Sequence, residues 1–123
     1  SYLSRWTELR REHARFYDKN LPSEVGRILE AKGARHVYYM YVIRAQQRDA
    51  LIAFLKKQGI ECGIHYPIPL HLQPAYTSYG FRKGQFPVSE QLASEIVSIP
   101  MYPELTNKQR QYVVDHIKKF IHR

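Results

Sequence analysis

Residues 36–43 have the sequence His-Val-Tyr-Tyr-Met-Tyr-Val-Ile, a run of apolar and aromatic side chains. β-Branched and aromatic residues favour extended backbone. Because both faces of the run are apolar, the pattern is typical of a strand covered on both sides, near the middle of a sheet. The other predicted elements are placed around this strand.

The segment after this run predicts a helix and a second strand. Residues 47–58 show helical spacing, with an inward apolar set and an outward basic pair: Leu51, Phe54 and Leu55 against Lys56 and Lys57. Gly59 supplies the left-handed residue with which helices commonly end. Residues 60–65 then predict a second strand, so residues 36–65 predict a β-α-β unit with a right-handed crossover.

Residues 2–20 predict an amphipathic helix. Its stripe recurs at spacings of four and three residues: Tyr2, Trp6, Leu9, His13 and Phe16. Pro22 disfavours helical geometry at Leu21 and ends the helix. A stripe with so little aliphatic mass needs a partner surface, and we expect the chain to be part of a longer protein. Residues 22–35 contain two glycines and mixed charges, which indicates a loop or a short, weak helix.

The C-terminal half predicts a proline-rich loop followed by two helices. Residues 66–87 contain four prolines and three tyrosines without a sustained period, which indicates an ordered loop. Residues 89–97 predict a short helix, and residues 98–100 a brief strand end, because proline cannot donate to a ladder. Thr106 and Gln109 form a capping box for the last helix. The short helix is expected to bury Leu92, Ala93 and Ile96. The last helix is expected to expose Arg110 to solvent and to bury six residues: Tyr112, Val113, His116, Ile117, Phe120 and Ile121.

These elements predict an α+β fold: a small mixed or antiparallel sheet packed by helices, with a long N-terminal amphipathic helix. A length of 123 residues suits a single domain. Hydrophobic residues at 44% and aromatics at 13% exclude a disordered or collagen-like chain. No apolar run approaches the roughly 20 residues of a membrane helix. The lone Cys62 excludes an internal disulfide and a four-cysteine zinc site, and a reducing, cytoplasmic setting is expected.

The chain is basic, with 19 Lys and Arg against 11 acidic residues and a formal net charge of +8. The excess is spread along the sequence and forms no tail. A basic surface attracts anions, whether nucleic acid, phosphorylated metabolites or an acidic partner. A solvated surface without a specific anion remains the alternative.

The densest group of chemically useful side chains is His65-Tyr66-Pro67-Ile68-Pro69-Leu70-His71, followed by Gln73-Pro74-Ala75-Tyr76. Two prolines stiffen this loop, which leaves the end of a predicted buried strand and presents polar rings. A ligand-facing role is slightly favoured over a packed proline corner. A metal site at His65 and His71 is disfavoured, because no carboxylate lies near them in sequence.

Other candidates are weaker. Cys62 lies in a strand pattern, where a free cysteine acts as a small hydrophobe. The loop at residues 80–84 holds Arg82 and Lys83 between two glycines and could bind a phosphate, but it lacks the P-loop pattern, so a solvated turn is favoured. His13 and His116 lie on apolar helix faces and are expected in the core or an interface. No complete catalytic set is found.

The motifs of this sequence together resemble those of a known family. The order of its motifs is similar to the C-terminal part of the DegT/StrS family of pyridoxal-phosphate-dependent sugar aminotransferases, in the fold type I aspartate aminotransferase superfamily. The most specific motif is the proline-rich segment at residues 65–71. The other matching pieces are residues 36–44, the helix around Arg48 and Leu51, Gly59-Ile60, and residues 86–90 and 98–106. The resemblance runs from about Trp6 to Phe120.

The resemblance implies that residues 1–123 are one domain, a C-terminal fragment of a larger enzyme. Residues 1–21 would pack on the other domain, and residues 36–123 would form the α+β small domain. The complete enzyme would move an amino group from glutamate to a nucleotide-linked keto sugar in polysaccharide or antibiotic sugar biosynthesis, although some family members dehydrate sugars instead. Pyridoxal phosphate and its Schiff-base lysine would belong to the absent large domain. No lysine here lies in a matching motif: Lys19, Lys32, Lys56, Lys57, Lys83, Lys108, Lys118 and Lys119. The fragment alone is expected to be inactive and to bind no cofactor.

The resemblance also implies where substrate would bind. Five residues would face the mouth of the active-site cleft and contact the sugar nucleotide: His65, Tyr66, His71, Tyr76 and Arg82. Catalytic, cofactor-binding and metal residues are not expected in this chain. The implied partners are the missing large domain, a second copy in a homodimer of the full-length protein, and the nucleotide sugar, with no membrane. The alternative is a basic nucleic-acid-binding or regulatory interaction module, favoured by the charge of +8 and the ten tyrosines and disfavoured by the dispersion of the cations.

Overall fold

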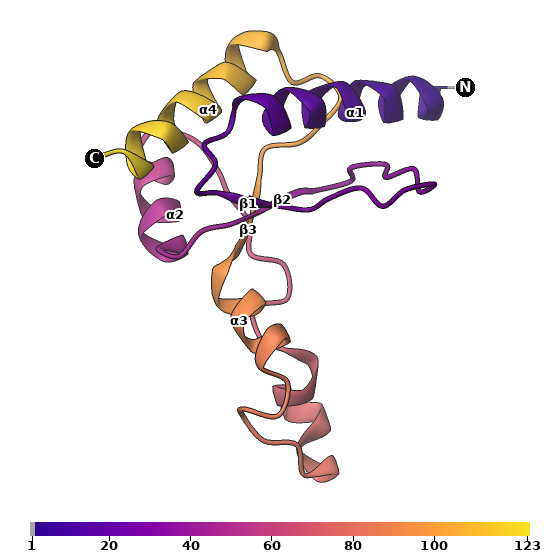
Figure 1. The fold of residues 1–123 in the computed structure, drawn as a ribbon, viewed down its shortest axis with the longest axis vertical. Coiled ribbons are helices and arrows are strands. Elements are labelled where there is room, and N and C mark those ends of the chain that lie inside the picture. Colours follow the sequence, from indigo (N-terminus) through magenta and orange to yellow (C-terminus); the bar gives the residue numbers. More distant parts are fainter. Residues whose placement is uncertain (1) are drawn as a thin grey trace.

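The computed structural model describes residues 2–123. Its elements are α1 (Tyr2–Asn20), β1 (Gly26–Arg27), β2 (Tyr41–Arg44), α2 (Arg48–Lys57), the 3₁₀ helices η1 (Leu70–Leu72) and η2 (Pro74–Tyr79), α3 (Pro87–Glu95), β3 (Ile96–Ile99) and α4 (Asn107–Ile121). The fold combines helices with a small antiparallel sheet (Figure 1), so the predicted α+β class is confirmed.

The sheet has three antiparallel strands in the order β1-β2-β3, with β2 in the middle as predicted. Tyr41 pairs with Ile99, and Ile43 pairs with Val97. Cross-strand partners point to the same face of a sheet, and these four side chains are all buried. They form the floor of the hydrophobic core.

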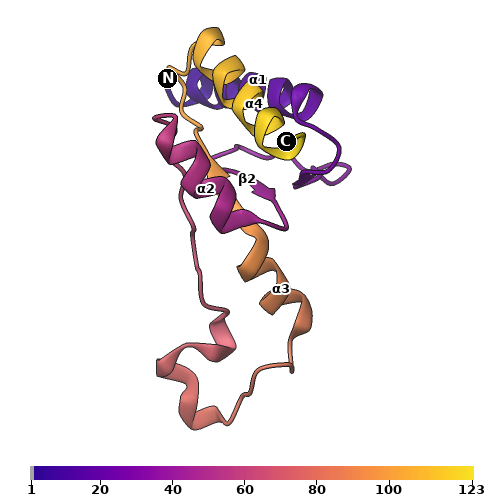
Figure 2. The same ribbon diagram turned by 90° about the vertical axis from the view of Figure 1, so that its left-hand side faces the viewer.

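Three helices complete the core. α1 and α2 both pack against α4 (Figures 1 and 2). The largest fully buried side chains include Tyr17, Leu51, Leu55 and Ile117. The capping box predicted for the last helix is confirmed: the Gln109 amide donates to the Thr106 hydroxyl, and the Thr106 amide donates to the Gln109 side chain. Gly59 ends α2 with φ of 74°, also as predicted.

The predicted β-α-β unit is wrong. Residues 60–65 form no strand beside β2; Gly63 alone makes an antiparallel bridge, and its partner is Ser98 of β3. The strand predicted at residues 36–43 is also shorter than predicted: β2 begins at Tyr41. Tyr38 has φ of 47°, which breaks an extended chain, and the His36 carbonyl accepts a hydrogen bond from Arg11 instead of a strand. Val42 is half-buried and Arg44 exposed, so β2 is not fully covered on its second face. Residues 22–35 contain the short strand β1 and no helix.

The buried faces of the helices differ from the predicted stripes. In α1 the buried residues are His13, Ala14 and Tyr17, whereas Tyr2 and Trp6 are exposed. In α4 the buried set is Arg110, Val113, Val114, Ile117 and Phe120. Tyr112 is 46% exposed and His116 only half-buried, while Arg110 is buried because its guanidinium lies over the Phe16 ring and bonds to His13. Of the three residues expected to be buried by the short helix, only Ala93 is.

Residues 64–95, which contain η1, η2 and α3, form an arm that extends away from the three core helices (Figures 1 and 2). Within residues 66–87, predicted as loop, the chain forms the two 3₁₀ helices. Several large apolar side chains of the arm are exposed: Tyr66, Ile68, Leu70, Tyr76, Tyr79, Phe81, Phe86 and Val88. Among residues 2–123, no helix is both long enough and apolar enough to cross a membrane.

Candidate functional site

The base of the arm holds His65 against the sheet. Its Nδ1 lies 3.0 Å from the Ser98 hydroxyl. The backbones of Gly63 and Ser98 exchange two hydrogen bonds, of 3.0 and 2.8 Å. His65 also lines a cavity of about 330 Å³ together with Tyr39, Met40 and Cys62, among others. A histidine ring is therefore held at the mouth of a hollow.

The next residue, Tyr66, has an unusual backbone. Its φ is 59°, in the left-handed region that non-glycine residues rarely adopt, and it precedes Pro67, which disfavours helical-type geometry. Its side chain is 79% exposed, so the ring makes little contact that would favour this geometry. Such backbone strain clusters at ligand sites, which makes Tyr66 a candidate contact residue.

His71, farther along the arm, is tied to Glu90. Its Nε2 lies 3.0 Å from a Glu90 carboxylate oxygen, and its ring packs 4.7 Å from the Phe86 ring. The same carboxylate accepts the backbone amides of Gly84 and Phe86. Burial raises the pKa of Glu90, but the hydrogen bonds from the Gly84 amide, His71 and the Phe86 amide outweigh it and keep that pKa below its usual value. This group of contacts, the Glu90 latch, joins η1 to the start of α3.

Tyr76 and Arg82 lie in the outer part of the arm. Tyr76 shares with His71 an apolar hollow of about 310 Å³, and its ring lies 5.9 Å from that of Tyr79. Arg82 is exposed, and its backbone amide donates to the Gln85 side chain. The Gly84 amide, a donor that a phosphate could have used, is already bonded to Glu90. The loop thus lacks this backbone donor for a phosphate, and its exposed Arg82 side chain is the group that could attract an anion.

The five predicted site residues thus do not form one cluster. His65 lines one cavity at the base of the arm, whereas His71 and Tyr76 line another between the 3₁₀ helices and α3. Cys62 is half-buried, and burial raises the pKa of its thiol to about 11, as expected for an apolar structural cysteine. Within residues 2–123, no three His, Cys, Asp or Glu side chains come together in a way that could hold a metal ion.

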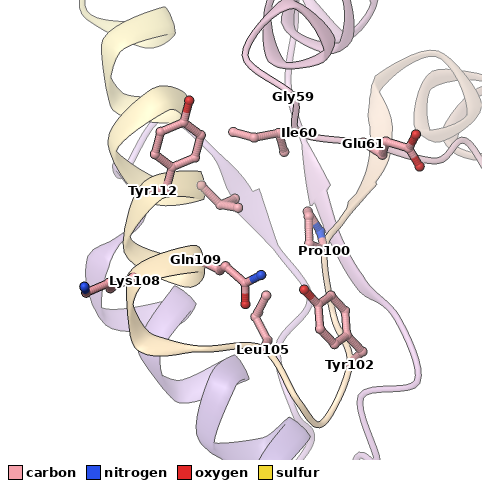
Figure 3. A pocket seen from close by; sticks show the side chains of 10 residues that line it. Gly59, Ile60, Glu61, Pro100, Tyr102, Leu105, Lys108, Gln109 and Tyr112 are labelled. Atoms are coloured by element: carbon pink, nitrogen blue, oxygen red, sulfur yellow. The ribbon is translucent and has the colours of Figure 1, made fainter.

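Three features escaped the sequence analysis. Ser98 and Glu90 act through contacts 33 and 19 residues away, although Ser98 could have been noticed as the polar residue within Ile-Val-Ser-Ile, and Glu90 as an acid in the first turn of a helix. The third is a cavity of about 590 Å³ between the end of α2, the segment after β3 and the start of α4 (Figure 3). Ile60, Pro100 and the tyrosines 102 and 112 contribute to its walls, and no local motif links these segments.

Pyridoxal phosphate, the implied cofactor, needs a lysine amine that is unprotonated and faces a cleft. Seven of the eight lysines of this chain are exposed, and Lys118 is half-buried. Lys108 borders the cavity of Figure 3, but its side chain points away from it. The residues present here therefore do not fit a Schiff-base site.

A family model describing the DegT/DnrJ/EryC1/StrS aminotransferase family matches residues 1–118. A protein of Geobacillus stearothermophilus named pleiotropic regulatory protein is 49% identical over 97% of this chain and 33% of its own length. The dTDP-3-amino-3,6-dideoxy-alpha-D-galactopyranose transaminase of Aneurinibacillus thermoaerophilus is 33% identical over 98% of this chain and 33% of its own length. The chain thus spans about a third of the length of these relatives.

Comparison with solved structures supports the same family. S. venezuelae DesV, in complex with a ketimine intermediate, aligns with a TM-score of 0.91 and 30% identity over 96% of this chain and 32% of its own. A DegT DnrJ EryC1 StrS aminotransferase from Brucella abortus aligns with a TM-score of 0.87 and 36% identity over the same shares of the two chains. This chain, with its small antiparallel sheet and histidine-proline arm, belongs to the DegT/DnrJ/EryC1/StrS aminotransferase family.

Proposed function

We propose that this chain is the small domain of a pyridoxal-phosphate-dependent aminotransferase that moves an amino group from glutamate to a nucleotide-linked keto sugar. The observation that carries the proposal is the match to DesV, which extends over 96% of the chain at a TM-score of 0.91. The Aneurinibacillus relative, a transaminase by name, supports the same reaction class. The cofactor, when bound, carries the amino group between donor and acceptor. In this proposal the cofactor and its lysine belong to the part of the protein outside this chain, and the chain alone is inactive.

The proposed task of this chain is to grip the sugar nucleotide. His65 and Tyr66, at the base of the arm, present polar groups that can hydrogen-bond sugar hydroxyls. Arg82 is exposed on the outer loop and can attract the diphosphate. Tyr76 borders the apolar hollow of the arm and offers a ring for stacking. His71 supports the grip through the Glu90 latch, which holds the arm in shape.

The proposed partner is the remaining two-thirds of a full-length protein of the relatives' size. Two surfaces of this chain need such a partner. Tyr2 and Trp6 expose an aromatic pair on α1, with ring centroids 6.0 Å apart. The arm exposes the eight large apolar side chains given above. Apolar surface of this extent on a small chain marks an interaction site. In the full-length protein a homodimer is proposed as the assembled form.

The test uses the full-length protein that contains this chain. Incubation with pyridoxal phosphate, glutamate and a dTDP-linked keto sugar is expected to yield an amino sugar and 2-oxoglutarate in equal amounts, measured by mass spectrometry. The 123-residue chain alone should produce neither. Arg82→Ala should raise KM for the sugar nucleotide several-fold and leave kcat nearly unchanged, with Lys108→Ala as the matched control. A dehydrated sugar without glutamate consumption, or turnover by the chain alone, would overturn the proposal.

A second function is favoured by one observation, the name pleiotropic regulatory protein carried by the relative that is 49% identical. Under this alternative the surface of net charge +8 binds nucleic acid or a regulatory partner. Titration of labelled duplex and single-stranded DNA at two salt concentrations distinguishes the two functions. Micromolar binding that weakens steeply with salt would support the alternative.

A further inference from the structure

Ser98 occupies an unusual place in the sheet. Its neighbours in β3, Val97 and Ile99, point into the core beneath the helices. Because side chains alternate along a strand, Ser98 points to the opposite face, toward the base of the arm. There its Oγ lies 3.0 Å from Nδ1 of His65 and 3.9 Å from Sδ of Met40. A buried hydroxyl on this face therefore contacts the first polar ring of the arm.

Gly63 completes the seat for this ring. A Cβ atom at Gly63 would lie 3.1 Å from Cε1 of His65, closer than packed atoms normally approach, and 3.6 Å from its Nδ1, an ordinary contact distance. The absence of a side chain at Gly63 thus leaves room for the imidazole in its observed position, which a Cβ atom would displace by a few tenths of an ångström. The two backbone hydrogen bonds between Gly63 and Ser98 fix the Gly63 backbone beneath the imidazole relative to the Ser98 hydroxyl. His65 is held from below and at one ring nitrogen, and its Nε2 makes no hydrogen bond within residues 2–123.

The hydrogen-bond partners of Ser98 indicate which nitrogen of the His65 imidazole carries the hydrogen. The Ser98 hydroxyl has one hydrogen, and Met40 Sδ, 3.9 Å away, is placed to accept it, since a thioether can only accept. The Ser98 oxygen is left as an acceptor for a hydrogen on Nδ1 of His65. A neutral imidazole with its hydrogen on Nδ1 has a lone pair on Nε2.

We propose that Ser98 is a positioning residue that holds His65 as the Nδ1–H tautomer, so that Nε2 accepts a hydrogen bond from a hydroxyl or amino group of the ligand. The inference deepens the proposed function, on which the identity of the ligand as a sugar nucleotide rests. It makes His65 an acceptor for neutral or cationic donors and a poor partner for phosphate oxygens, which also only accept. The sugar ring, rather than the diphosphate, is then the part of the substrate that His65 contacts.

The tautomer is measured directly by long-range ¹⁵N–¹H NMR correlation on the ¹⁵N-labelled chain, with the imidazole neutral. The expected result is an Nδ1 shift in the protonated range and an Nε2 shift in the unprotonated range. The reverse pattern in the unsubstituted chain would overturn the proposal and needs no variant. Ser98→Ala should move both nitrogens toward the reverse pattern, and Ser98→Thr, which keeps the hydroxyl, should not. Ser94→Ala is the matched control, because Ser94 is exposed and its hydroxyl, within residues 2–123, bonds only to the Gln91 carbonyl of its own helix.

In the full-length enzyme, Ser98→Ala should raise KM for the sugar nucleotide about 3- to 10-fold, as for one weakened hydrogen bond, with a smaller change in kcat. Ser98→Thr should restore most of the loss. An unchanged KM beside a changed tautomer would overturn the role in binding. Because the NMR measurement does not depend on turnover, absence of aminotransferase activity would contradict the proposed function and leave the tautomer result intact.

Discussion

Replacing His13 by phenylalanine tests the contact that joins the first and last helices. His13 is 3% exposed, and its Nε2 lies 3.1 Å from the Pro103 carbonyl oxygen. Its Nδ1 lies 3.0 Å from an Arg110 guanidinium nitrogen. A carbonyl only accepts and a guanidinium only donates, so Nε2–H donates to Pro103, and Nδ1 accepts from Arg110. One neutral ring thus links α1 to α4 and to the segment before it.

The expected cost follows from these two hydrogen bonds. Phenylalanine keeps an aromatic ring of similar size, so no large cavity forms. A neutral buried hydrogen bond contributes about 0.5–1.5 kcal/mol, and one to a charged group about 1.5–3 kcal/mol. The free energy of unfolding should therefore fall by about 2–4 kcal/mol. Divided by a urea slope of about 1–3 kcal/mol/M, this loss should move the unfolding midpoint down by roughly 0.7–4 M.

Urea unfolding followed by circular dichroism measures this change. His116→Phe is the control, because His116 is half-buried and, in the described part of the chain, hydrogen-bonds only to the Tyr112 carbonyl of its own helix. It should lower stability by less than about 1 kcal/mol. In a double-mutant cycle with Arg110→Met, the coupling energy should exceed about 1 kcal/mol. A loss below about 0.5 kcal/mol in His13→Phe, or no coupling to Arg110, would refute the proposed linkage.

Three further predictions concern other parts of the chain. Alkylation of Cys62 by iodoacetamide should be slow at neutral pH and accelerate toward pH 11 or on unfolding, because burial raises the thiol pKa to about 11; equal rates in the folded and urea-unfolded chains would contradict this. Because the pKa of Glu90 is lowered in the folded chain, the Glu90 latch stabilises the arm at pH values above the usual glutamate pKa and loses that contribution as pH falls through the lower folded pKa. The NMR signal of the Gly84 amide, which donates to Glu90, should shift over that acid range. A signal that stays constant would rule the latch out. Tyr17→Phe should cost about 1–2 kcal/mol in urea unfolding, because the Pro100 carbonyl loses its 2.8 Å hydrogen bond; an unchanged midpoint would show that water replaces it.

Local sequence signals predicted the elements whose cause is local. The helix at residues 2–20, the helix that ends at Gly59 and the capping box at Thr106 each depend on side chains within a few residues of one another. The strand end predicted at residues 98–100 was found in part: β3 spans Ile96–Ile99, so Ile96 and Val97, predicted as the end of the short helix, are strand. The prolines and glycines of residues 66–87 predicted an ordered loop there, whereas the chain forms two 3₁₀ helices and extends as an arm (Figure 1).

The errors arose where distant contacts outweigh local preference. Residues 60–65 have a strand-like pattern, yet Gly63 found its hydrogen-bond partner in Ser98, 35 positions later in the chain, and not in β2. The sequence predicts Arg110 on the surface, because arginine is charged. Its guanidinium is buried because it bonds to His13 and lies over the Phe16 ring, both nearly a hundred positions earlier in the chain. Periodicity identifies a helix and leaves open which of its faces meets the rest of the chain.

For the candidate site, the sequence determined the chemistry available, two histidines and a tyrosine on a proline-stiffened segment, since these are properties of adjacent residues. The folded arrangement decided how each is used: His65 against Ser98, His71 bound to Glu90, and Tyr66 strained and exposed. The physical reason is that hydrogen-bond direction and burial depend on partners that lie 19 and 33 positions apart in the sequence and are brought together by packing. No local pattern contains that information.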